Sequence, residues 1–206
     1  TSDDSMQSII NNWKSLVNKD KQSTNTYNAK WEDVSNSYSN VESNAKTGNM
    51  SPEDIKTSMV GLREGAGIAV DFGRSSIEAG EVSQKKIGEV RKKDNDLKDQ
   101  LYVSERVRGD IFSPNITLQD HRDYVKNGRT IDLPSANLAS TTGGTIKHHI
   151  SPAYYQAAMS SYQAELSDTM FNTQPVDTDS TVDFNRQLAT LTKIEVLRVF
   201  NNSMLM

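Results

Sequence analysis

Residues 51–73, SPEDIKTSMVGLREGAGIAVDFG, decide how this chain folds. The opening SPED is a helix start, because serine accepts bonds from unpaired amides, proline suits the first helical position and acids favour the positive helix end. Small residues then recur at every fourth position, namely Gly61, Gly65, Ala69 and Gly73. Residues four apart share one helix face, so these four form a nearly bare ridge. Each glycine costs about 1 kcal/mol of helix propensity relative to alanine, and we expect a closely packed second helix to offset that cost.

The residues before this ridge predict one long amphipathic helix. Its stripe advances in steps of four and three, and most of its positions are apolar, as at a seam between two helices. The stripe consists of Met6, Ile10, Trp13, Val17, Asp20, Thr24, Tyr27, Trp31, Val34, Tyr38 and Val41. We expect Trp13, Tyr27 and Trp31 to be helix-packing residues rather than a ligand box, because their spacing is that of the seam.

The same rhythm continues from Pro52 to about Arg108, which predicts a second helix on the order of 80 to 90 Å long unless it breaks near Gly73 or Gly80. A turn about Gly48 would bring the two helices together as a long antiparallel hairpin. That hairpin sets large residues against small ones. The expected pairs are Trp31 with Gly65, Tyr27 with Ala69, and Trp13 with Ser83.

Helical periodicity disappears between residues 113 and 150. There Asn127-Gly128 separates two alternating segments, which is a strong hairpin signal, and Gly143-Gly144 gives a second, weaker one. We expect a small β or irregular appendage. Polar, turn-rich elements of this kind often carry contacts with partners. The candidate partner-binding residues in it are Tyr124, Asn127, Arg129, His148 and His149.

Helices resume at Ser151-Pro152, which repeats the start signal of Ser51-Pro52. A further helix is expected from Ser180, and its apolar face is wide enough to be buried against two neighbours, one of which could be a second copy of the chain. Phe200 and Leu205 are its candidate partner-binding residues.

The expected fold is mainly α, an elongated helical bundle built on the long hairpin and carrying the small appendage. Its predicted parts are the hairpin over residues 1–112, the appendage over 113–150 and two further helices over 151–206 that pack on the hairpin.

Composition excludes several classes of protein. The chain has no cysteine, so a disulfide scaffold, a thiolate zinc site and a cysteine nucleophile are excluded. Only 34% of its 206 residues are hydrophobic, which predicts a thin core. A formal net charge of -4 argues against a nucleic-acid partner. No long apolar run occurs, so we expect no transmembrane segment.

Motifs for chemistry are equally sparse. The sequence has no phosphate-binding loop and no nucleophile elbow, and Gly65-Ala66-Gly67 lies inside a helical pattern. His121, His148 and His149 could meet Asp120 or Asp123 at a metal ion, but we expect exposed loop histidines, with pH-sensitive contacts as a further alternative. We therefore expect no catalytic residue, no cofactor and no metal site.

The stretch Ser180 to Arg186, followed by a helix to Met206, resembles the C-terminal coiled-coil helices of flagellar rod proteins. Those proteins also carry an asparagine-rich and alanine-rich motif after their first helix, and this chain lacks it. The broader plan of long helices with an irregular appendage is similar to minor pilus-tip proteins of type IV secretion systems, without a shared motif. We assign no family from either resemblance.

These features favour a non-catalytic structural or adhesive component of an exported assembly, such as a pilus, secretion apparatus, filament or virion. Its partners would be proteins, and its location would be periplasmic, at the cell surface or in a virion if Thr1 follows a processed segment. The alternative is an intracellular helical adaptor that docks partner helices. An enzyme with an unrecognised site in residues 113–150 is a third hypothesis.

Overall fold

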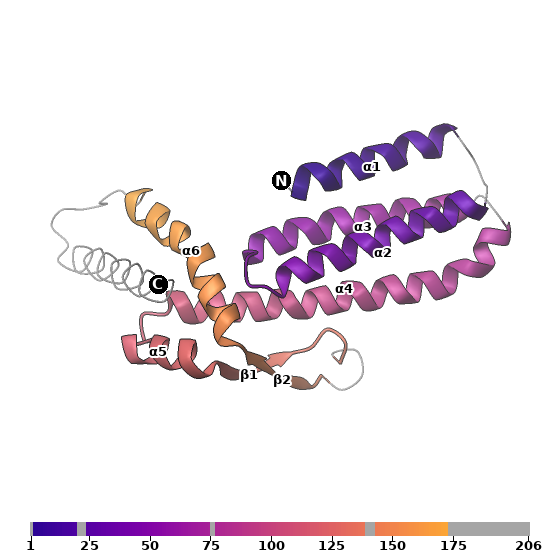
Figure 1. Cartoon of the computed structure of the whole chain (residues 1–206). Helices are drawn as coiled ribbons and strands as arrows, with labels where there is room; N and C mark the ends of the chain where they lie inside the picture. The colour runs from indigo at the N-terminus through magenta and orange to yellow at the C-terminus, as the bar shows by residue number, and fades with distance from the viewer. Residues whose placement is uncertain (1, 20–23, 75–76, 139–142, 173–206) are drawn as a thin grey trace. The chain divides into compact units, whose positions relative to one another are not determined.

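Helices make up most of the chain in the computed structural model, which describes residues 2–19, 24–74, 77–138 and 143–172 (Figure 1). The elements in chain order are α1 (Ser2–Lys19), α2 (Thr24–Ala45), α3 (Pro52–Arg74), α4 (Ile77–Phe112), α5 (Leu118–Asn127), β1 (Arg129–Pro134), β2 (Thr145–Ile150) and α6 (Pro152–Asn172). The two strands pair in one sheet. The predicted helical class is therefore confirmed.

The chain divides into two compact units. Unit 1 comprises Thr1–Lys46, Pro52–Val103 and Asp132–Ile146, and unit 2 comprises Thr47–Ser51, Ser104–Ile131 and Lys147–Met206. The segment 113–150, expected as one appendage, is divided between them.

The single helix expected over residues 6–41 is wrong, because the chain reverses between α1 and α2. The indole Nε1 of Trp13 on α1 donates a hydrogen bond to Oδ2 of Asp33 on α2 at 3.4 Å. In one unbroken helix the 20 residues between them would span about 30 Å. Of the two polar seam positions, Thr24 is the first residue of α2, and Asp20 lies outside the described residues.

A second reversal separates α3 from α4. Nε of Arg63 lies 3.0 Å from Oδ1 of Asp94, although the 31 residues between them would span about 46 Å of continuous helix. α3 ends at Arg74, beside Gly73, which is one of the two positions where a break was anticipated. Unit 1 is thus not one long hairpin, since α1 and α2 both pack against α3 (Figure 1) and α4 folds back to meet α3.

Aromatic side chains cover the glycine ridge of α3. A Cβ atom on Gly65 would overlap the ring of Trp13 from α1, and one on Gly73 would overlap the ring of Tyr27 from α2. A Cβ on Gly61 would lie 3.1 Å from Cγ of Met6. The ridge is therefore shared by two helices, α1 over its first half and α2 at its end.

The pairs differ from those expected, since Trp13 takes the place assigned to Trp31 and Tyr27 packs four residues further along α3. Trp31 and Ala69 are fully buried in the same unit. The reversal after α1 explains the difference. In one continuous helix Trp13 would have lain beyond the ridge, near Ser83, whereas the reversal places it on Gly65.

The hairpin expected at Asn127-Gly128 is wrong, since residues 118–127 form α5. Thr117 caps this helix, its Oγ1 accepting from the N–H of Asp120 at 3.1 Å. Gly128 has φ of 69°, and its N–H donates to the carbonyl of Tyr124 at 2.8 Å. The positive φ that Asn-Gly provides thus ends a helix here instead of forming a two-residue turn.

The weaker hairpin signal is half right. β2 follows Gly143-Gly144 as expected, but its partner is β1 at residues 129–134 rather than residues 138–141. Ile131, Leu133 and Ile150 are the buried residues of the two strands.

The helix expected at Ser151-Pro152 is confirmed as α6, where Oγ of Ser151 accepts from the N–H of Tyr154 at 3.0 Å. The further helix expected from Ser180, with Phe200 and Leu205, lies outside the described residues.

Replacing glycines of α3 by alanine should lower the free energy of unfolding at two positions and raise it at a third. Gly65→Ala and Gly73→Ala should each lower the free energy of unfolding by about 1 to 3 kcal/mol, because the new methyl group meets a ring that cannot retreat. Gly67→Ala is the matched control on the same helix. Nothing lies within 4 Å of its Cβ position, so this variant should gain about 1 kcal/mol of helix propensity. Urea unfolding measures all three, and a uniform shift would contradict the packing.

Tyr27→Phe should leave unit 1 as stable as the parent or raise its stability by about 1 kcal/mol. The Tyr27 hydroxyl is buried and has no hydrogen-bond partner in the described part of the chain, so its removal relieves an unpaired polar group. Calorimetry would show an equal or higher melting temperature. A loss above about 1 kcal/mol would mean that the hydroxyl has a partner after all.

Candidate functional site

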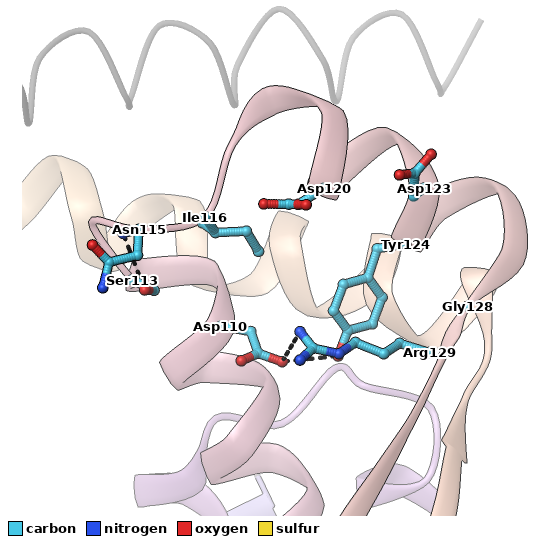
Figure 2. A pocket seen from close by; sticks show the side chains of 9 residues that line it. All are labelled: Asp110, Ser113, Asn115, Ile116, Asp120, Asp123, Tyr124, Gly128 and Arg129. Carbon is cyan, nitrogen blue, oxygen red and sulfur yellow. Dashed lines mark hydrogen bonds and ion pairs between the residues drawn. The ribbon is translucent and has the colours of Figure 1, made fainter.

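A cavity of about 450 Å³ opens in unit 2 (Figure 2). Its walls come from the end of α4, the loop that follows it, α5 and the start of β1. The lining residues are Asp110, Ser113, Asn115, Ile116, Asp120, Asp123, Tyr124, Gly128 and Arg129. We call this cavity the α5 pocket.

Asp110 connects three of these walls. Its Oδ2 accepts a hydrogen bond from the hydroxyl of Tyr124 at 3.1 Å and lies 3.5 Å from Nη1 of Arg129. Its Oδ1 lies 3.5 Å from Nε of Arg106, one turn earlier on α4. One carboxylate thus ties α4 to α5 and to β1, and this fixes the floor of the pocket (Figure 2).

Tyr124 forms the side wall and holds α5 to α6. Its ring stacks on the ring of Tyr155 with centroids 3.7 Å apart and an interplanar angle of 8°. The guanidinium carbon of Arg129 lies 5.8 Å from its ring centroid. Burial, and then the charge of Asp110, raise the pKa of the Tyr124 phenol well above its usual value. The phenol is therefore a fixed hydrogen-bond donor and not an acid or base at neutral pH.

Behind this wall, Nδ1 of His121 hydrogen-bonds the hydroxyl of Tyr155. His121 is only 3% exposed, so the expectation of an exposed loop histidine is wrong for this residue. Burial also raises the pKa of Tyr155. His121 turns inward because it lies on the buried face of α5 together with Tyr124 and Val125.

Two further carboxylates stand on α5. Asp120 accepts the N–H of Thr117 at 2.8 Å, and this bond lowers the pKa of its carboxyl group. Oδ1 of Asp123 accepts a hydrogen bond from Nε2 of Gln119 at 3.0 Å. Both hydrogen-bond donors are neutral, so neither bond brings a compensating positive charge into the pocket. The pocket therefore carries three carboxylates and one guanidinium.

The structure brings two of the five partner-binding candidates of residues 113–150 into this pocket, Tyr124 and Arg129. Tyr124 is only 3% exposed, and its role as a partner-binding residue stays a prediction. Asn127 and His149 are exposed and His148 is half-buried, and none of the three lines the pocket. Nδ1 of His149 lies 3.3 Å from Oγ1 of Thr130 on the paired strand.

Sequence reasoning missed the floor and the loop wall, namely Asp110, Ser113, Asn115 and Ile116. The Thr117-to-Asp120 capping signal could have revealed α5, because a threonine followed three residues later by an acid is a helix start. Within the described ranges, no group of three histidine, cysteine, aspartate or glutamate side chains could hold a metal ion.

No described helix combines the length and the apolar character needed to cross a membrane. Comparison of the chain with family models, with curated proteins and with solved structures finds no match.

Stability should fall as the pH rises above about 10, the usual pKa of tyrosine. The folded-state pKa values of Tyr124 and Tyr155 are raised, so the stability they contribute is complete below that pH and is lost as the phenols ionise. Urea unfolding from pH 8 to 12 measures the slope. In Tyr124→Phe the slope above pH 10 should be smaller by up to about 1.4 kcal/mol per pH unit. An unchanged slope would contradict the buried hydrogen bond to Asp110.

Proposed function

We propose that this protein is a non-catalytic structural or adhesive component of an exported macromolecular assembly, such as a pilus, secretion apparatus, filament or virion. In this proposal unit 1 is a packed helical scaffold, and unit 2 docks a protein partner at the α5 pocket. The proposed location is periplasmic, at the cell surface or in a virion.

The composition of the chain supports the scaffold role. A chain without cysteine and with only 34% hydrophobic residues must be stabilised by efficient contacts rather than by disulfides or a large core. The rings of Trp13 and Tyr27 make such contacts on the ridge of α3. Packing contacts of this kind do not depend on a bound metal ion or on the redox conditions of the compartment, which suits a protein that is exported.

The observation that carries the docking role is the way in which Asp110 fixes the pocket. It holds the phenol of Tyr124 and lies beside the guanidinium of Arg129, so walls from α4, α5 and β1 are set before any ligand arrives. A preformed recess binds without the entropic cost of ordering its walls. The phenol of Tyr124 keeps its proton and donates it to Asp110, so it fixes a wall of the pocket rather than transferring a proton.

Crosslinking mass spectrometry on the protein in its native source tests this proposal. Lys126 is exposed on α5 and should crosslink to a protein partner. Asn115→Trp fills the pocket from its exposed loop wall and should reduce those crosslinks about tenfold or more. Val60→Trp is the control, because Val60 is 66% exposed on α3 in unit 1 and should leave the crosslinks unchanged.

Equal crosslink yields from Asn115→Trp and the parent would remove the docking role of the pocket. Fractionation of the native source separates the export proposal from the alternative, an intracellular helical adaptor. A partner recovered only in the cytosolic fraction would favour that adaptor.

A further inference from the structure

The charge of the α5 pocket is not balanced. Arg129 and Arg106 both lie against Asp110, so the charge of this carboxylate is fully compensated. Asp120 and Asp123 form no ion pair with any lysine or arginine in the portion of the chain that the structure describes, and their hydrogen bonds come from an amide N–H and a glutamine side chain. The residues that line the pocket, three carboxylates and the guanidinium of Arg129, therefore carry an excess of two negative charges. Arg106 pairs with Asp110 from outside the lining and reduces this excess to one in the wider surroundings.

The chain's own Arg129 shows which group this recess accommodates. Its guanidinium lies over the ring of Tyr124 and beside the carboxylate of Asp110, which are the two kinds of group that bind guanidinium ions. Arg129 does not fill the recess, since its side chain is 48% exposed and its distance of 3.5 Å to Asp110 is longer than a strong charge-assisted hydrogen bond.

The remaining walls suit a long side chain with a cationic head. Figure 2 shows Ile116 on one side of the recess, Asp120 above it, Tyr124 opposite, and Asp110 with Arg129 below. The methylene stem of an arginine can pack on the apolar Ile116 while its planar head meets the carboxylate of Asp120. The hydrogen bond from the amide of Thr117 lowers the pKa of the Asp120 carboxyl group and so favours its charged form.

We infer that the α5 pocket binds an arginine side chain presented by the partner protein, with Asp120 as its main contact and Asp123 adding charge at the rim. This inference rests on the proposed docking function and names the chemical group that the partner supplies. Arg129 stays on Asp110 and limits the affinity for a second cation, because like charges repel.

The test uses the full chain and two small probes, N-acetyl-arginine amide and its citrulline counterpart, which has the same shape without the charge. Titrations followed by the NMR signals of the Ile116 methyl groups should show the arginine probe binding about tenfold more tightly than citrulline, as charge-assisted hydrogen bonds predict. Asp120→Asn, which keeps an oxygen for the amide of Thr117, should weaken arginine binding about tenfold. Asp123→Asn should weaken it by a smaller factor. Glu32→Gln, an exposed acid of α2 in unit 1, is the charge-matched control and should change nothing.

Arg129→Gln gives the sharpest result. It should tighten binding of the arginine probe several-fold, since it removes a competing positive charge. Weaker binding in this variant, or equal binding of the citrulline probe, would overturn the inference.

The two proposals fail in different ways. If Asn115→Trp abolishes the partner crosslinks but the arginine probe does not bind, the docking function stands and the arginine inference is overturned. If the probe binds but Asn115→Trp leaves the crosslinks unchanged, the pocket takes small guanidinium ligands, which overturns both the docking function and a partner's arginine as its ligand.

Discussion

Unit 1 depends on the contact between the rings of Trp13 and Tyr27 and the bare face of α3. Gly65 and Gly73 weaken α3 as an isolated helix, and the space that they leave is filled by the two rings. Tyr27 and Trp31 also bury polar atoms without hydrogen-bond partners among the described residues, a further cost of about 1 to 3 kcal/mol for each. The apolar area that these rings bury must outweigh both costs, so close approach of the helices is a condition for folding rather than a refinement of it.

The same contact explains what the sequence could and could not predict. The ridge and its aromatic partners follow from spacings of four and three, which depend only on helix geometry. The direction of the chain does not follow from them, because two helices that fold back on each other keep the same stripe as one continuous helix. Polar residues at Asp20 and Thr24 were the available sign of the reversal, and in a seam they are equally consistent with a position that sets register. Because the sequence does not show whether the chain reverses, it predicts Trp31 as the partner of Gly65, whereas the structure places Trp13 there.

The pocket shows a different limit of sequence reasoning. Tyr124 and Arg129 were candidates because they stand in a polar, turn-rich stretch, and both do line the pocket. Asp110 was not a candidate. Its partners, Tyr124 and Arg129, stand 14 and 19 positions later in the sequence and reach it only once α5 has formed. The error at Asn127-Gly128 hid α5, since a glycine with positive φ serves a helix end as well as a hairpin.

A pocket that must recognise a charged group faces a conflict, because carboxylates placed close together repel one another and destabilise their own walls. The structure separates the two tasks. Asp110, at 15% side-chain exposure, is neutralised and holds the walls together, whereas Asp120 is stabilised as an anion by the amide of Thr117 at the start of α5. A helix start favours negative charge whether or not a ligand is present. In the proposed site the carboxylate of Asp120 is thus stabilised first by the backbone amide of Thr117, with only a lesser contribution from the positive charge of Arg129, so its charge remains available to a partner.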